Sequence, residues 1–398
     1  MLKTLEGVRV IDFGMAAAGP SATKILSEFG AEVIVVEPLQ GTSTRWMTNT
    51  YDYWSDGKKS VPLDAKSEEG REVLLRLVAS ADVFASNFRA KALQKLGLTY
   101  EDLKKVNPEI IYAVTYGWGA KGPLKDDAAY DITAFFARGG YLRDMAEKGS
   151  ICVPPQGMAD ASLGEILSAG ICAALFRKLK TGKGCELSTS LFAQACYLDN
   201  FQSANIQLGE DAFQKTRTAP REALCNTYKC ADGEYIIMFD NQFDRHFWNI
   251  MKAIGREDLV GDKRWTNIDD TKFDKAPELV AILEEAFSKM TAEEAVAALK
   301  SVDVAVEKCA SYVDKVTDPQ AIANDYVFDW KLSSGKYEGK TIKLVATPIA
   351  FNGENCVSDY KRAPRLGEHT VEALKSVGYS DEEIKKLADD KKIFIEEK

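Results

Sequence analysis

The chain has 398 residues, of which 45% are apolar, and this length and composition favour a globular protein of two domains. Its formal net charge of −9 argues against general nucleic-acid binding. No apolar run reaches the ~18 residues of a membrane span, and the first residues lack a signal-peptide pattern, so we expect a cytoplasmic protein without a membrane partner. Eight cysteines without a CxxC pair and only two histidines, His246 and His369, predict reduced thiols and no metal site.

The chain opens with a predicted strand–helix–strand unit. An apolar strand at 8–13 is followed by a small-residue turn at 14–20, a helix at 21–29 and a second apolar strand at 33–36. This order is typical of nucleotide-binding α/β folds. The turn lacks the G-x-G-x-x-G fingerprint, so a nicotinamide-dinucleotide site is only weakly indicated. The turn's small residues either allow close packing of helix on strand or leave room for an extended ligand arm such as pantetheine.

Strands and helices continue to alternate through the first half. A surface loop is expected at 40–60, helices at 67–80 and from 98, and strands at 82–88 and 110–116. Such alternation predicts a mostly parallel sheet covered on both faces, with ligands bound at the carboxyl ends of the strands. Glu37, Asn87 and Gly117 lie near such ends. The cations that follow Asn87 are either phosphate partners or solvated surface charges.

Asp160 is the candidate reactive residue. It lies in the stretch Gly157–Gly164, before a long apolar helix that is expected to end near Gly182. A carboxylate at a helix start has two interpretations. It either caps the helix or is a nucleophile kept ionised by the helix end, and the local sequence does not decide.

The second half predicts a smaller unit inserted into the large domain. The large domain is expected at 1–205, a linker at 206–225, a small α+β domain at 226–326, and a return segment at 327–398. The small domain should contain a hairpin turning at Asp232-Gly233, followed by helices near 247–254, 276–290 and 292–299. The return segment should end in a charged helix at 381–389.

Several short motifs together resemble the family III CoA-transferases over essentially the whole chain. They are Leu5–Asp12, Gly19-Pro20, Gly30–Pro38, Leu63–Lys66, Asn87-Phe88, Leu96–Leu103, Asn107-Pro108, the Asp160 stretch, Thr181–Gly184 and Ala363–Thr370. The resemblance implies a Rossmann-like large domain, a smaller domain, and a ring-shaped chain in an interlocked homodimer. It also matches Asp160 to the family's nucleophilic aspartate, which would form an aspartyl mixed anhydride and then an aspartyl-CoA thioester.

Coenzyme A would be a substrate and carrier, with no tightly bound cofactor. By resemblance, the residues that contact it are Ala16, Ala17, Ala18, Leu63, Lys66, Asn87, Phe88, Lys95, Leu96 and Tyr130. The lysines would meet phosphates as point charges.

Two differences from the formyl-CoA-transferase-like members of the family restrict the expected class of substrate. Ala17 stands where formyl-CoA-transferase-like members carry glutamine, and the stretch Met238–Gln242 has none of the glycines of their active-site loop. The stretch Tyr130–Gly140 resembles the 2-hydroxyacyl subgroup of amino-acid-fermenting anaerobes. We therefore expect an enoyl-CoA donor, a 2-hydroxy acid acceptor such as 2-hydroxyisocaproate, and a product that feeds a 2-hydroxyacyl-CoA dehydratase.

Three alternatives remain at this stage. A 2-methylacyl-CoA racemase would carry a histidine where this chain has Tyr130, and a tyrosine with a pKa of about 10 is a poor base at neutral pH. A non-catalytic CoA- or nucleotide-binding protein would give no covalent adduct on Asp160. A NAD-dependent dehydrogenase is disfavoured by the missing glycine fingerprint.

Overall fold

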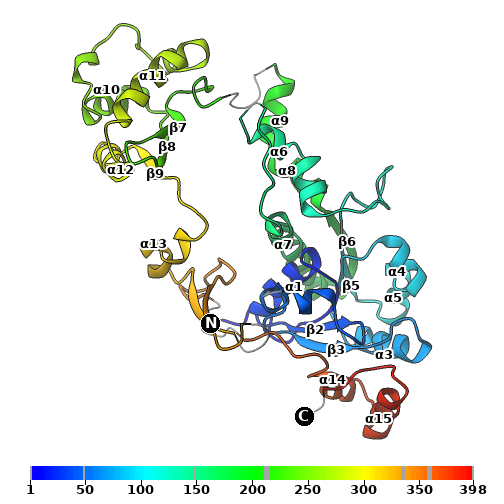
Figure 1. Ribbon diagram of the computed structural model, residues 1–398. Helices are drawn as coiled ribbons and strands as arrows, with labels where there is room; N and C mark the ends of the chain where they lie inside the picture. Colours follow the sequence, from blue (N-terminus) through cyan, green and yellow to red (C-terminus); the bar gives the residue numbers. More distant parts are fainter. Residues whose placement is uncertain are drawn as a thin grey trace. The chain divides into compact units, whose positions relative to one another are not determined.

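The computed structural model describes residues 2–47, 50–147, 149–209, 216–332, 337–355 and 361–396 (Figure 1). The chain separates into two compact units. The first comprises Met1–Gly139, Pro154–Asp199 and Asp318–Lys398, and the second comprises Gly140–Val153 and Asn200–Thr317. Part of the predicted linker, residues 210–215, lies outside the described residues.

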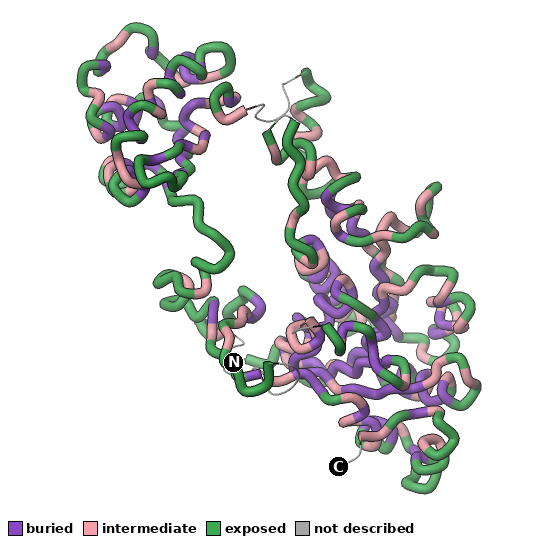
Figure 2. The backbone as a smooth tube through the Cα atoms, in the orientation of Figure 1, coloured by how far each residue is buried: buried purple, intermediate pink, exposed green. Residues whose placement is uncertain are grey.

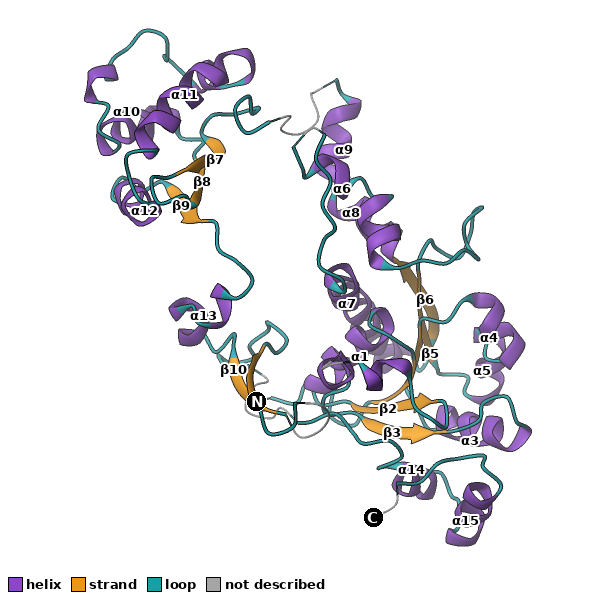
Figure 3. Ribbon diagram, viewed as in Figure 1, coloured by secondary structure: helices purple, strands orange, loops and turns teal. Residues whose placement is uncertain are grey.

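The first unit is built on a six-stranded sheet in the order β3-β2-β1-β4-β5-β6, with every neighbouring pair parallel (Figure 3). The strands are β1 (Arg9–Phe13), β2 (Glu32–Glu37), β3 (Lys59–Pro62), β4 (Val83–Ser86), β5 (Ile111–Tyr116) and β6 (Cys185–Ser190). This strand order is that of dinucleotide-binding folds, in which ligands bind beyond the carboxyl ends of the strands. The predicted α/β class with a parallel sheet is confirmed.

The central strands are apolar along their length because both faces of the sheet are covered. Val10 and Ile11 are adjacent on β1 and point to opposite faces, yet both are fully buried. Figure 2 shows the same burial along the neighbouring strands.

One face of the sheet is covered by α1 (Ala18–Glu28) and the long helix α7 (Met158–Thr181). The two helices approach closely because Gly164 has no side chain; an added Cβ would lie 2.4 Å from Ser21 Oγ. Among the described helices, α7 alone is long and apolar enough to meet a length-and-composition criterion for a membrane span. Leu163, Leu167 and Ile171 are nevertheless at most 1% exposed, so this side of α7 belongs to the core of the unit.

The opposite face is covered by helices from both ends of the chain. They are α3 (Glu68–Ala79), α4 (Ala90–Leu96), α5 (Tyr100–Val106), α14 (Thr370–Ser376) and α15 (Asp381–Asp389). Ser67 caps α3, and Thr99 and Ser380 form capping boxes on α5 and α15, which fixes where these helices begin. The predicted C-terminal helix is confirmed.

The predicted surface loop at 40–60 is partly wrong. It contains a 3₁₀ turn, η1 (Ser43–Trp46), and a short helix, α2 (Thr50–Trp54). Lys58 at its end is buried, and its Nζ donates to Asp12 Oδ2 (3.0 Å) and to the carbonyl of Pro20 (2.9 Å). This ion pair anchors the segment under the start of α1.

The described residues of the first unit form five further elements. They are η2 (Ile132–Ala137), α8 (Leu191–Leu198), α13 (Pro319–Ala323), β10 (Phe328–Lys331) and β11 (Thr341–Leu344), of which the last two form an antiparallel pair. The strand-like return segment predicted from the sequence is therefore present.

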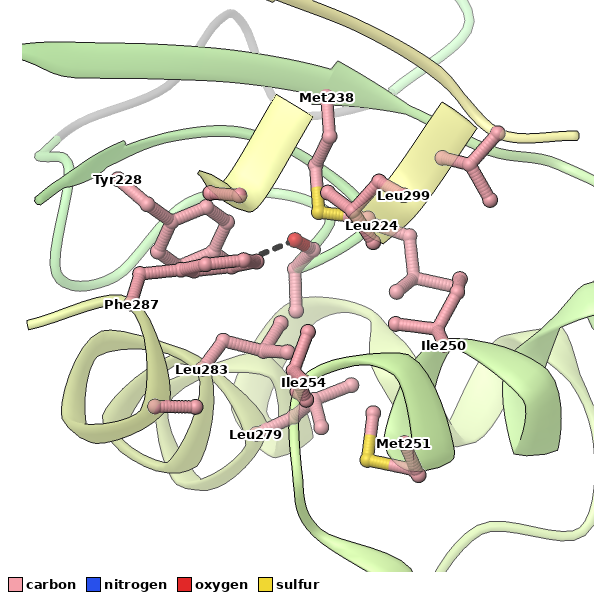
Figure 4. Packing of buried hydrophobic residues seen from close by; sticks show 14 of the residues in the cluster. Leu224, Tyr228, Met238, Ile250, Met251, Ile254, Leu279, Leu283, Phe287 and Leu299 are labelled. Atoms are coloured by element: carbon pink, nitrogen blue, oxygen red, sulfur yellow. Dashed lines mark hydrogen bonds between the residues drawn. The ribbon is translucent and has the colours of Figure 1, made fainter. Parts of the chain in front are cut away.

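The second unit packs helices on a three-stranded antiparallel sheet. Its strands are β7 (Cys225–Lys229), β8 (Tyr235–Phe239) and β9 (Ala305–Lys308), and its longer helices are α9 (Asn200–Gln207), α10 (Phe243–Ala253), α11 (Ala276–Phe287) and α12 (Ala292–Lys300). The shorter turns are α6 (Tyr141–Asp144), η3 (Glu257–Leu259), η4 (Ile268–Thr271), η5 (Phe273–Lys275) and η6 (Asp314–Val316). Figure 4 shows side chains of α10 and α11 packed together with Tyr228 and Met238 of the sheet. The predicted hairpin is confirmed.

Candidate active site

Asp160 is the third residue of α7 and not its cap. The N-cap position belongs to Gly157, whose φ of 85° is unfavourable for residues with a side chain, and no side chain caps this helix end. The N–H of Gly157 is instead bound by Asp131 Oδ2 at 2.7 Å. The capping interpretation of Asp160 is therefore wrong. Among the residues that the structure describes, none donates a hydrogen bond to the Asp160 carboxylate.

The backbone around Asp160 is held by two neighbouring helices. Ser21 Oγ of α1 donates to the Asp160 carbonyl at 2.9 Å. Gln194 Nε2 of α8 donates to Ser162 Oγ at 2.8 Å, and Ser162 Oγ in turn donates to the carbonyl of Ala159. These bonds fix the first turn of α7, and therefore the direction in which the carboxylate leaves the helix.

The electrostatic environment makes Asp160 a weaker acid than usual. Burial is the larger cause and the negative charge of Asp131 the smaller one, and together they raise the pKa of Asp160 to about 7. Asp131 is only 4% exposed, and its carboxylate accepts from the N–H of Ile132 (2.8 Å) as well as from Gly157. Two carboxylates with different partners are typical of a site where one of them reacts.

Asp131 is the site residue that the sequence did not reveal. It lies within the stretch that resembles the 2-hydroxyacyl subgroup, but an aspartate before a helix has an ordinary capping explanation. Its partner Gly157 is 26 residues away, so no local spacing links the two.

The predicted turn contacts lie together. α1 begins at Ala18; Ala17 is buried, and Ala16 is exposed in the left-handed region at φ 58°. Asn87 holds this turn from β4: its Oδ1 accepts from the N–H of Met15 (2.9 Å), and its Nδ2 donates to the carbonyl of Met15 (2.6 Å). Asn87 thus shapes the turn through both ends of its amide.

A cavity of about 430 Å³ lies at the carboxyl ends of β1, β2 and β3, which is within the usual size range of ligand sites. Four predicted contacts line it: Leu63, Lys66, Phe88 and Leu96. A second cavity of about 540 Å³ shares Lys66 and Leu96 with the first and adds the predicted contact Lys95. Five of the ten predicted CoA contacts therefore line these two adjoining cavities.

Six predicted residues do not line these two cavities: the turn residues Ala16, Ala17, Ala18 and Asn87, and also Tyr130 and Asp160. Tyr130 is 73% exposed and directly precedes Asp131. Asp160 is joined to the cavity region through α1, because Ser21 contacts Asp160 while Met15, at the turn before α1, lines the 430 Å³ cavity.

No cluster of three or more metal-ligating side chains occurs in the described part of the chain. His369 lies beside β3, where its Nδ1 accepts from the N–H of Ser60 (3.4 Å). His246 is buried in the second unit against Asp240 (2.7 Å). The position before Asp131, where a racemase would carry its histidine, is occupied by Tyr130.

Comparison with known proteins identifies the architecture and the reaction class. The model of CoA-transferase family III matches residues 5–370. The chain belongs to this family. It is 38% identical to the (R)-2-hydroxy-4-methylpentanoate CoA-transferase of Clostridioides difficile, over 97% of this chain and 98% of that protein. It is 34% identical to the cinnamoyl-CoA:phenyllactate CoA-transferase of Clostridium sporogenes, over 98% and 97%.

Comparison with solved structures supports the same fold. A crystal structure of Rv3272 from M. tuberculosis matches with a TM-score of 0.80 at 30% identity, covering 92% of this chain and 98% of that one. The chain is a CoA-transferase with a mixed α/β fold, and it uses CoA as substrate and carrier. The predicted family is confirmed, and the racemase alternative is less supported.

Proposed function

We propose that this enzyme transfers CoA from an acyl-CoA, expected to be an enoyl-CoA, to a 2-hydroxy acid such as 2-hydroxyisocaproate, with Asp160 as nucleophile. The assignment of Asp160 rests on one observation. Its carboxylate lies in the first turn of α7, at a helix end without a side-chain cap, and no described residue donates a hydrogen bond to it. The two clostridial relatives are each named after a 2-hydroxy acid, 2-hydroxy-4-methylpentanoate and phenyllactate, which supports a 2-hydroxy acid as the acceptor.

The reaction needs four exchanges at carbonyl carbons. Asp160 attacks the donor thioester and releases CoA thiolate, leaving a mixed anhydride. The thiolate attacks the aspartyl carbonyl, which releases the donor acid and forms an aspartyl-CoA thioester. The acceptor carboxylate then displaces the thiolate from the aspartyl carbonyl and gives a second anhydride. Attack of the thiolate on the acceptor's acyl carbonyl forms the product and frees Asp160.

The start of α7 suits this chemistry. Its first intrahelical bond runs from Ala161 to the Gly157 carbonyl, so the N–H groups of Met158, Ala159 and Asp160 are outside the helical ladder, and no side chain caps them. Donors of this kind stabilise a developing oxyanion by about 3 kcal/mol each. A pKa of about 7 leaves a substantial ionised fraction of Asp160 at neutral pH.

The CoA contacts in this proposal fall into three groups. The turn residues Ala16, Ala17, Ala18 and Asn87 would lie along the extended arm. The cavity residues Leu63, Phe88 and Leu96 would hold the nucleotide, with Lys66 and Lys95 as phosphate partners. Tyr130 would contact the ligand near Asp160. Lys66 and Lys95 are exposed, and no described residue forms an ion pair with either.

We also propose the interlocked homodimer of ring-shaped chains. Large apolar side chains are exposed on two consecutive helices of the first unit, α7 and α8, which is unusual for a surface that faces only water. They are Ile166, Phe176, Leu179, Tyr197 and Leu198. A second copy of the chain is the occupant we propose, and light scattering coupled to size-exclusion chromatography should give twice the chain mass. A purely monomeric protein would contradict this part.

The proposal retains the cytoplasmic location and a 2-hydroxyacyl-CoA product that a dehydratase consumes during amino-acid fermentation. It is tested by offering a panel of carboxylic acids with one enoyl-CoA donor and identifying new thioesters by mass spectrometry. We expect 2-hydroxy acids to be preferred and Asp160→Ala to abolish transfer without loss of fold. Equal use of acids without a 2-hydroxyl would refute the acceptor class, and substantial transfer by the variant would refute the nucleophile.

A further inference from the structure

Glu37 lies at the carboxyl end of β2 and lines the 430 Å³ cavity. In dinucleotide-binding folds with this strand order, an acidic residue about 20 residues beyond the glycine turn accepts hydrogen bonds from the adenosine ribose. Glu37 is well placed for that task, but its side chain has no exposed surface. Its environment shows why it has a different role.

Four donors occupy the Glu37 carboxylate. Oε1 accepts from Arg45 Nη2 (2.6 Å) and Ser60 Oγ (2.7 Å), and Oε2 accepts from Arg45 Nε (2.8 Å) and the N–H of Thr42 (3.1 Å). A carboxylate has about four acceptor positions. Glu37 therefore has none left for a ribose hydroxyl, and its charge is balanced by a bidentate guanidinium.

Arg45 is held in place from several sides. Its guanidinium stacks on the Tyr51 ring at 3.9 Å, and its Nη2 also bonds the Tyr51 hydroxyl. Its Nη1 donates to the carbonyl of Pro364 at 3.1 Å, which brings in the C-terminal return segment. The Arg45 side chain is only 11% exposed. Such a fork loses little entropy on pairing, so the pair is a fixed part of the cavity wall.

We propose that the Arg45–Glu37 pair sets the nucleotide specificity of this cavity, by admitting an adenosine whose ribose carries a phosphate and excluding one bound through its free hydroxyls. The inference rests on the proposed CoA site, since the adenosine of CoA carries a 3′-phosphate. With Glu37 neutralised, the wall does not repel that phosphate. Lys66 on the cavity lining and Lys95 in the adjoining cavity supply the attractive charge.

The experiment compares KM for an acyl-CoA and for the same acyl ester of 3′-dephospho-CoA. Arg45→Met leaves an unbalanced carboxylate in the wall, and its repulsion of the phosphate at an effective dielectric of about 20 predicts a fall of about tenfold or more in the preference for the 3′-phosphate. Glu37→Gln leaves an unbalanced cation, so the preference should rise. The double variant Glu37→Gln/Arg45→Met should return towards the wild-type ratio.

The control is Arg9→Met. Arg9 pairs with Glu32 at the opposite, amino end of β2, so this variant loses an arginine–glutamate pair away from the cavity and should keep the wild-type ratio. A merely structural role for Arg45 would change both KM values together and leave the ratio fixed, which would overturn the inference.

Failure of this inference can be distinguished from failure of the proposed function. If Arg45→Met does not fold, Glu37→Gln still tests the sign of the effect, and a ratio that falls or stays constant contradicts the inference. If the wild-type enzyme uses neither ester, the proposed function itself fails. If it uses both esters equally well, only the specificity inference fails.

Discussion

Replacing Asp131 by Asn tests the electrostatic coupling at the site. The variant removes a buried negative charge that raises the pKa of Asp160. It also removes one acceptor, because an amide oxygen cannot bind the N–H groups of both Gly157 and Ile132 as the carboxylate does. The first change acts on the pH dependence of the reaction, and the second on the position of the first turn of α7.

The structure limits the size of each effect. The pKa of Asp160 rises from 3.8 to about 7, with burial as the larger cause and Asp131 as the smaller one. Loss of the charge therefore removes less than half of the rise, and the pKa of Asp160 should fall by roughly 0.5 to 1.5. The lost hydrogen bond, worth about 1 kcal/mol, should lower kcat by about fivefold at a pH where both enzymes are fully ionised.

The assay is the pH profile of kcat/KM, which reports the ionisation of the free enzyme. Asp160 attacks as a carboxylate, so the rate rises with pH through its pKa; a lower pKa moves that rise to lower pH. The control is Asp82→Asn, which removes a carboxylate that also accepts a backbone N–H, but at the amino edge of the sheet. An Asp131→Asn profile that stays in place, or moves to higher pH, would refute the coupling.

Three further outcomes are expected. Because the pKa of Asp160 in the folded protein lies above 3.8, this group favours folding at low pH and loses that contribution as pH rises through about 7. The free energy of unfolding of Asp160→Asn minus that of the wild type, measured with denaturant, should therefore be about 2 kcal/mol larger at pH 8 than at pH 5. An equal difference at both pH values would contradict the raised pKa. Lys66→Ala should raise the KM of the CoA ester about tenfold at nearly constant kcat, and an unchanged KM removes Lys66 from the site. Gly164→Ala should lower stability by about 2 kcal/mol, since the new Cβ meets Ser21 at 2.4 Å, whereas Gly170→Ala, with its nearest neighbour at 3.4 Å, should not.

The sequence predicted those parts of the fold that depend on neighbouring residues. The end of α7 was foreseen because Gly182 is a local signal of a helix end, and Gly182 indeed has φ 65°. The strands of the parallel sheet were foreseen because a strand buried on both faces is apolar throughout. Both signals lie within a few residues of the feature that they predict.

What the sequence did not reveal depends on contacts between distant residues. Asp160 is not the cap because α7 begins two residues before it, after Gly157, and the N–H of Gly157 is bound by Asp131 from 26 positions away. The segment at 40–60 was expected to be a surface loop, but Lys58 pairs with Asp12 across 46 positions and draws its end into the interior. A lysine that is buried against such a partner and a lysine that faces solvent are the same residue type in the sequence, so the periodicity of polar and apolar residues cannot distinguish them.

The most direct test of the central claim is to capture the acylated aspartate. The enzyme is incubated with an acyl-CoA, treated with hydroxylamine, digested, and the peptide that contains Asp160 is examined by mass spectrometry. A covalent intermediate predicts a hydroxamate on Asp160, formed only when acyl-CoA is present and absent in Asp160→Asn. An unmodified peptide from an enzyme that still transfers CoA would contradict the account, as would a hydroxamate on a different carboxylate.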